Sequence, residues 1–177
     1  MRVVLFGTTE LAIAVAEVLS DLPEVELAAG VHAPAVIRAS YAPGGRPNVR
    51  HADLGAWCTA HGVPTHEFVD ASGLTAAVGE WEGDLAIVAG WYHLIPRAVL
   101  DQFALGAVGL HASLLPRFRG AAPLNWAILA GERETGISLF ELTDGVDEGR
   151  LYGQVTVPIG PRATIAELIA ATSESGL

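Results

Sequence analysis

Short apolar segments alternate with helix-forming segments along most of this 177-residue chain. The apolar runs predict strands, and the segments between them are rich in helix formers. The expected strands are 3–6, 25–31, 64–68, 84–89 and 107–110, and the expected helices are 10–19, 53–61, 74–81 and 96–103. Repeated strand–helix units predict an α/β fold, in which a mostly parallel sheet carries helices on both faces.

The remainder of the chain continues the pattern with a helix at 123–130, strands at 137–142 and 152–157, and a final helix at 163–172. A chain of this length with 51% hydrophobic residues can bury one sizeable core. Because it contains no repeat or low-complexity linker, we expect one domain over residues 1–177 and no second domain. Residues 173–177 have neither a helix cap nor a closing strand, so the last helix is expected to be incomplete.

The charge and cysteine content narrow the classes of partner and location. A net charge of −10 makes nucleic acid an unlikely partner, because phosphate binding needs a basic surface. The single cysteine, Cys58, cannot form an internal disulfide, and the N-terminus lacks the order of a signal peptide. No apolar run approaches the roughly 20 residues of a spanning helix. These features predict a cytoplasmic protein without a membrane partner, and its oligomeric state stays open.

Two common kinds of site are not expected. Gly7 lies in a strand–helix turn without the GxGxxG pattern, which weighs against a nicotinamide cofactor. The histidines at 32, 51, 61 and 66 have no partners at metal-site spacing, and the acids at 144, 147 and 148 lack the alternating oxygen donors of a calcium loop. We therefore predict no metal.

The segment 39–50 is rich in proline and glycine and is flanked or interrupted by Arg38, Arg46 and Arg50. Such a density of breakers predicts an irregular loop. Two interpretations remain open for it. It is either a solvated surface loop or a clamp for an anionic substrate.

A second loop, 113–122, follows a histidine at the end of an expected strand. His111 would lie at the carboxyl end of its strand, where open parallel sheets place ligands. Taken singly, His111 would be interpreted as a buried histidine whose hydrogen bonds are satisfied, and Asp147 would be interpreted as a turn residue. Together with the Pro- and Gly-containing loop, they favour a site for chemistry.

The residues from His111 to Gln154, HASLLPRFRGAAPLNWAILAGERETGISLFELTDGVDEGRLYGQ, resemble the signature region of the formyltransferases that use 10-formyltetrahydrofolate. The stretches VVLFGTTELA and DLAIVAGWYHLIPRAVLD resemble further segments of the same family, which includes enzymes that formylate methionyl-tRNA, glycinamide ribonucleotide and amino sugars. The resemblance implies a Rossmann-like N-terminal catalytic domain, 10-formyltetrahydrofolate as the formyl donor and an amine as the acceptor.

The family's catalytic set is an Asn, a His two residues later and a more distant Asp, which implies catalytic roles for His111 and Asp147. Amine attack on a formyl carbon creates a negative oxygen and releases a proton, and an imidazole oriented by a carboxylate serves both needs. Gly109 stands where the family has Asn, so one oxyanion donor is missing. Losing such a donor typically costs about 2.7 to 4 kcal/mol of barrier. His93 and Asn125 are candidate replacements.

The resemblance also implies two sets of binding residues. The expected folate pocket comprises Tyr92, His93, Leu94, Ile95, Pro96, Ser113, Leu114 and Asp144, and the expected acceptor contacts are Arg119 and Asn125. For Leu94 and Ile95 a place in the core is an equal alternative, and Arg119 is equally an ordinary surface residue. Trp91 is expected to line the cleft.

The preferred function is therefore formyl transfer to a small amine, such as an amino sugar or an amino acid derivative. One alternative is an enzyme that formylates methionyl-tRNA. Another is a folate-binding module that has lost turnover because Gly109 replaces Asn. Hydrolysis, with water as the formyl acceptor, is a variant of the first reaction.

Overall fold

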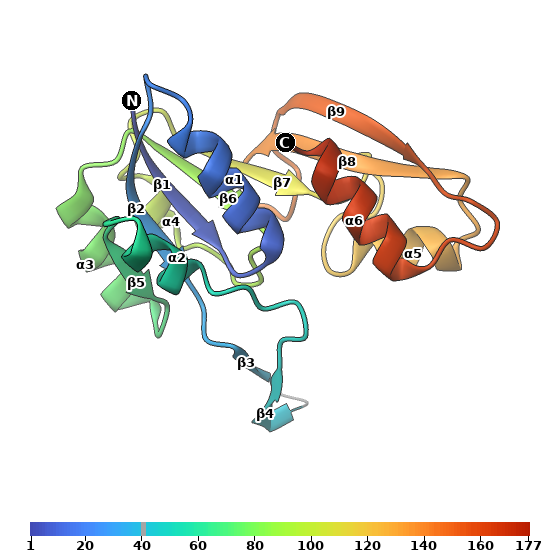
Figure 1. The fold of residues 1–177 in the computed structure, drawn as a ribbon, viewed down its shortest axis with the longest axis horizontal. Coiled ribbons are helices and arrows are strands. Elements are labelled where there is room, and N and C mark those ends of the chain that lie inside the picture. The colour runs from blue at the N-terminus through green and yellow to red at the C-terminus, as the bar shows by residue number, and fades with distance from the viewer. Residues whose placement is uncertain (40–41) are drawn as a thin grey trace. The chain divides into compact units, whose positions relative to one another are not determined.

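The computed structural model describes residues 1–39 and 42–177, which form two compact units, 1–107 and 108–177. The first unit contains four parallel strands in the order β5-β2-β1-β6 (Figure 1). These strands are β1 (Arg2–Gly7), β2 (Glu26–His32), β5 (Thr65–Glu67) and β6 (Leu85–Ala89). The helices between them are α1 (Glu10–Ser20), α2 (Leu54–Ala60) and α3 (Ala71–Trp81), and α4 (Arg97–Leu100) follows β6. The predicted α/β alternation is confirmed.

Helical segments cover both faces of this sheet. On one face, Gly7 at the end of β1 lies so close to Ala12 of α1 that a β-carbon would clash with it. On the opposite face, the ring of Phe6 packs edge-on against Phe103, just after α4, at 6.4 Å. The last helix predicted here is shorter than expected, because α4 ends at Leu100 rather than at Phe103.

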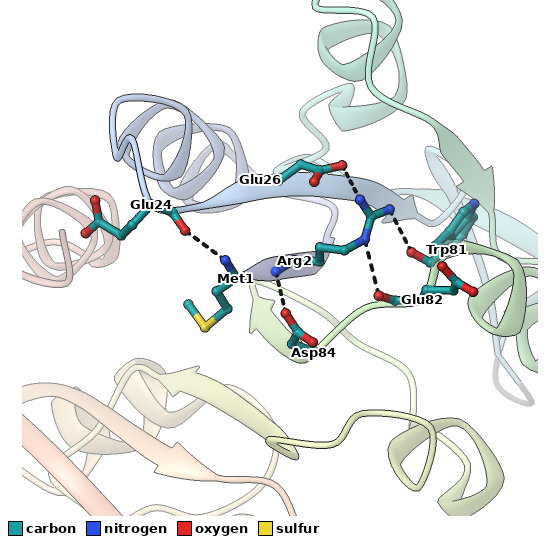
Figure 2. A network of polar contacts seen from close by, with 7 residues as sticks. All are labelled: Met1, Arg2, Glu24, Glu26, Trp81, Glu82 and Asp84. Carbon is teal, nitrogen blue, oxygen red and sulfur yellow. Dashed lines mark hydrogen bonds and ion pairs between the residues drawn. The ribbon is translucent and has the colours of Figure 1, made fainter.

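At the amino ends of the strands, Arg2 of β1 connects β2 and the end of α3 through its side chain (Figure 2). Its guanidinium pairs with Glu26 of β2 and donates to the carbonyls of Trp81 (3.0 Å) and Glu82 (3.3 Å) at the end of α3. Its backbone N–H donates to the Asp84 carboxylate at 2.7 Å. Sheets of this kind bind ligands at the carboxyl ends of their strands. The contacts of Arg2 lie at the opposite end of the sheet. They stabilise the scaffold.

The segment predicted as an irregular loop is instead partly a two-stranded antiparallel ribbon, β3 (Val36–Ala39) with β4 (Ala42–Pro47). Its prolines are tolerated because both strands of a two-stranded ribbon are edge strands, whose outer sides need no N–H donor. Positions 40 and 41 of that segment lie outside the described residues. Arg46 is exposed, and Arg50 lies 3.9 Å from the Glu10 carboxylate.

The second unit is a three-stranded antiparallel sheet with two helices. Its strands are β7 (Ala107–His111), β8 (Glu134–Glu141) and β9 (Leu151–Pro158), and its helices are α5 (Pro123–Leu129) and α6 (Ile165–Ser175). Leu124, Val157 and Leu168 form its core. A capping box between Thr164 and Glu167 begins α6, and Gly176 caps its end with an N–H bond to the Ser173 carbonyl. Whether this helix is incomplete, as the sequence suggests, stays a prediction.

Replacing Gly30 with alanine is expected to lower the free energy of unfolding by about 1–3 kcal/mol. Gly30 is buried in β2, and a β-carbon there would clash with Sγ of Cys58 in α2. Urea unfolding should show a lower midpoint with an unchanged slope. In a Cys58→Ala background the same substitution should cost less, because the sulfur is gone; an equal cost in both backgrounds would locate the strain elsewhere.

Candidate active site

The structure brings His111 and Asp147 together. His111 is the last residue of β7, and its Nδ1 lies 3.4 Å from Oδ2 of Asp147. Both side chains are mostly shielded, with exposed fractions of 11% and 20%. A carboxylate so close to a shielded imidazole fixes the orientation of the ring.

The second nitrogen of His111 is also engaged. Nε2 lies 2.9 Å from the backbone carbonyl of Phe118, a residue with a positive φ of 55°. A carbonyl only accepts, so the proton of this bond lies on Nε2. Each ring nitrogen of His111 thus faces an acceptor, the Asp147 carboxylate at Nδ1 and the Phe118 carbonyl at Nε2, and these two contacts fix the orientation of the ring. The ring edge of Phe140, 6.3 Å away, closes one side of the site.

Asp147 is itself held in place by the loop that follows His111. The backbone N–H of Gly120 donates to Oδ2 of Asp147 at 2.7 Å. Asp147 adopts a left-handed conformation, with φ of 49°, in the turn after β8. The same carboxylate oxygen therefore links this turn, the loop and the imidazole.

Gly109 lies two residues before His111 on the same face of β7 and is buried. A β-carbon at this position would lie 2.7 Å from Cδ1 of Leu142 and 3.0 Å from Cε1 of Phe140. Apolar side chains therefore fill the space where the expected amide would begin. Asn125, one candidate replacement, is exposed on α5, and His93, the other, belongs to the first unit.

Residues of the loop after His111 differ in their surroundings. Ser113 is fully buried, and its hydroxyl donates to the carbonyl of Arg117 at 2.7 Å. Leu114 packs against Gly136 of β8. Arg119 is exposed, as is Asp144 in the turn after β8. Nothing in the sequence indicates that Phe118 and Gly120 contact the site, since both act through backbone atoms. Ser138 and Gln154, whose hydrogen bonds to this loop are described below, stand out in the sequence only as polar residues within apolar strands.

In the first unit, the segment after β6 forms an aromatic cluster. The Trp91 ring packs edge-on against Phe6 at 5.8 Å and Phe68 at 5.5 Å, and His93 lies 4.8 Å from Phe68. Burial lowers the pKa of His93, which favours its neutral form. The core alternative for Leu94 was wrong, because this side chain is 84% exposed.

Within the same segment, Tyr92 is 48% exposed, whereas Ile95 and Pro96 are half-buried. Partial burial raises the pKa of Tyr92, so its hydroxyl stays protonated. This part of the chain thus offers apolar and neutral polar groups, as a flat heterocycle would require.

Residues 1–39 and 42–177 contain no group of three or more His, Cys, Asp or Glu side chains able to hold a metal ion. No helix in these ranges is long and apolar enough to cross a membrane.

Comparisons with known proteins agree with one another. A methionyl-tRNA formyltransferase from Sorangium cellulosum (strain So ce56) is 36% identical over 171 residues, which are 95% of this chain and 52% of that protein. A methionyl-tRNA formyltransferase from Bacteroides thetaiotaomicron is 35% identical over 162 residues, which are 90% of this chain and 48% of that protein. The chain thus spans about half the length of the curated relatives it matches.

Solved structures show the same fold. Glycinamide ribonucleotide transformylase 1 from Geobacillus kaustophilus has a TM-score of 0.78 at 25% identity and covers 98% of this chain and 90% of its own. A formyltetrahydrofolate deformylase from Pseudomonas syringae pv. tomato has a TM-score of 0.78 at 23% identity, over 98% of this chain and 56% of its own. The profile of a family described as formyl transferase matches residues 1–176. This chain therefore belongs to the formyl transferase family.

Proposed function

We propose that this chain transfers a formyl group from 10-formyltetrahydrofolate to an amine. The observation that carries the proposal is the His111 imidazole held between the Asp147 carboxylate at 3.4 Å and the Phe118 carbonyl at 2.9 Å. Membership of the formyl transferase family supports the same reaction. We further propose that both units serve one catalytic domain and that the protein is cytoplasmic, which its lone cysteine favours.

The reaction forms a bond between the acceptor nitrogen and the formyl carbon and breaks the bond between that carbon and N10 of the folate. Negative charge develops on the formyl oxygen during attack, and an imidazole N–H aimed at that oxygen stabilises it. The amine gives up one proton, and N10 gains one as it leaves. His111 can exchange a proton at Nε2 when the contact with the Phe118 carbonyl opens, while Asp147 keeps the ring oriented at Nδ1.

We propose donor-binding residues in each unit separately: Tyr92, His93, Leu94, Ile95 and Pro96 in the first unit, and Ser113, Leu114 and Asp144 in the second. The apolar and neutral character of the segment after β6 supports this assignment. Arg119 and Asn125 are assigned to the acceptor, since both are exposed polar side chains close in sequence to the loop after His111.

The acceptor we favour is a small-molecule amine, because a net charge of −10 opposes the binding of a polyanion. Methionyl-tRNA is the second candidate. It is favoured by the names of the relatives that are 35–36% identical to this chain.

One assay separates these possibilities. The protein is mixed with 10-formyltetrahydrofolate and either a panel of amino sugars and amino acid derivatives or methionyl-tRNA, and tetrahydrofolate release is followed. Release that depends on an amine supports transfer and identifies the acceptor class. Release without any amine indicates hydrolysis, and tight donor binding without release indicates a binding module and contradicts the proposed function.

A further inference from the structure

A polar cluster, buried at Ser138 and exposed at Gln154, joins β8 and β9 to the loop after His111. The Ser138 hydroxyl donates to the Ser113 carbonyl at 2.6 Å and accepts from the Leu115 N–H at 3.1 Å. The Gln154 amide donates to the same hydroxyl at 2.8 Å and to the Leu115 carbonyl at 2.9 Å. Two side chains from two strands thus hold three backbone groups of one short loop segment.

The hydroxyl of Ser138 makes every hydrogen bond that a hydroxyl can make. Ser138 is fully buried, and its oxygen makes one donated and two accepted hydrogen bonds, which is all that a hydroxyl offers. Removing it would leave the Ser113 carbonyl and the Leu115 N–H without their side-chain partner inside the protein. Buried polar groups left in that state destabilise the conformation that contains them.

The held segment leads directly to the imidazole. The Ser113 N–H donates to the His111 carbonyl at 2.8 Å, and the Ser113 hydroxyl donates to the Arg117 carbonyl at 2.7 Å. These bonds fix the chain on both sides of the turn at residues 114–117. The next carbonyl, that of Phe118, is the one bound to Nε2 of His111 at 2.9 Å. Hydrogen bonds and the short stretch of backbone from Arg117 to Phe118 therefore connect Ser138 and Gln154 to the ring.

We propose that Ser138 and Gln154 are positioning residues for formyl transfer, because they hold the Phe118 carbonyl against Nε2–H of His111 and thereby fix the orientation of the imidazole beside Asp147. This inference rests on the proposed function for its effect on rate. The state of the ring is a separate consequence, which exists whether or not the reaction is formyl transfer.

Two substitutions and one matched control test the inference. Ser138→Ala removes the hydroxyl, and Gln154→Met removes the amide donors from an exposed position on β9 at nearly constant size. Thr135→Val is the control. Thr135 lies on the same strand as Ser138 and is 2% exposed, and its hydroxyl has no hydrogen-bond partner among the residues the structure describes.

The first readout is the ring of His111 in the ¹H–¹⁵N NMR spectrum, assigned with a His111→Gln variant. The Nε2–H signal should be protected from solvent exchange in the unmodified protein and in Thr135→Val, and it should be lost in Ser138→Ala and weakened in Gln154→Met. An unchanged signal in both test variants would overturn the inference. If Ser138→Ala fails to fold, Gln154→Met decides the question.

The second readout is turnover. A misplaced catalytic group can cost about 100-fold in rate, so kcat of Ser138→Ala should fall by about 10- to 100-fold while KM for donor and acceptor changes little. A rise in KM with an unchanged kcat would contradict the positioning role. If the unmodified protein shows no turnover with any acceptor, the proposed function has failed, and the NMR comparison still decides whether the two residues control the ring.

Discussion

Replacing His111 with alanine is expected to lower kcat for amine-dependent release of tetrahydrofolate by about 10²- to 10⁴-fold, the usual range for loss of a positioned acid–base group. The Asp147 carboxylate and the Phe118 carbonyl hold this ring from its two nitrogens, at 3.4 and 2.9 Å. Without the ring, the developing oxyanion loses a hydrogen-bond donor, and the acceptor loses the group that we propose takes up its proton. Single-turnover mixing with excess enzyme measures the chemical step directly.

His61→Ala is the matched control, because His61 is an exposed histidine that stacks on Trp57 in the first unit. That variant should retain full turnover. Circular dichroism and donor binding should be unchanged in both variants, so that a loss in His111→Ala reports on chemistry. Turnover that survives the loss of His111 would move the reaction to another group, and His93 would be the first to examine.

The second large effect concerns Gly109. In Gly109→Asn combined with Leu142→Ala, kcat is expected to rise by about 10²- to 10³-fold, the rate usually lost when one oxyanion donor is removed. The double substitution is needed because Cδ1 of Leu142 lies 2.7 Å from where the new β-carbon would be. Shortening that side chain opens room for the amide beside His111.

The four proteins of this comparison, namely the unmodified chain, each single variant and the double variant, form a complete cycle. Gly109→Asn alone should lose stability in urea unfolding and gain less in kcat than the double variant, because Leu142 must turn aside. Leu142→Ala alone should gain nothing. If the double variant gains nothing either, an amide at position 109 is not what limits this site, and the chain stabilises the oxyanion by other groups.

The order of strands and helices could be predicted from local pattern because each element carries its own signal. The run 3–6 and the helix formers of 10–19 define β1 and α1 within a residue or two. Prediction failed where tertiary context overrides composition. The breaker-rich segment 39–50 contains an edge ribbon, and the helix expected over 96–103 ends at Leu100.

The sequence by itself determined the fold class and the formyl transferase family, and it singled out His111 and Asp147 as candidates for chemistry, because all three rest on the pattern of residues along the chain. Only the tertiary structure decided what surrounds them. The carbonyl of Phe118 on Nε2, the N–H of Gly120 on Asp147 and the apolar side chains of Phe140 and Leu142 over Gly109 come from segments far apart in the chain or from backbone atoms. Every residue has the same backbone groups, so their part in the site is invisible until the chain is folded.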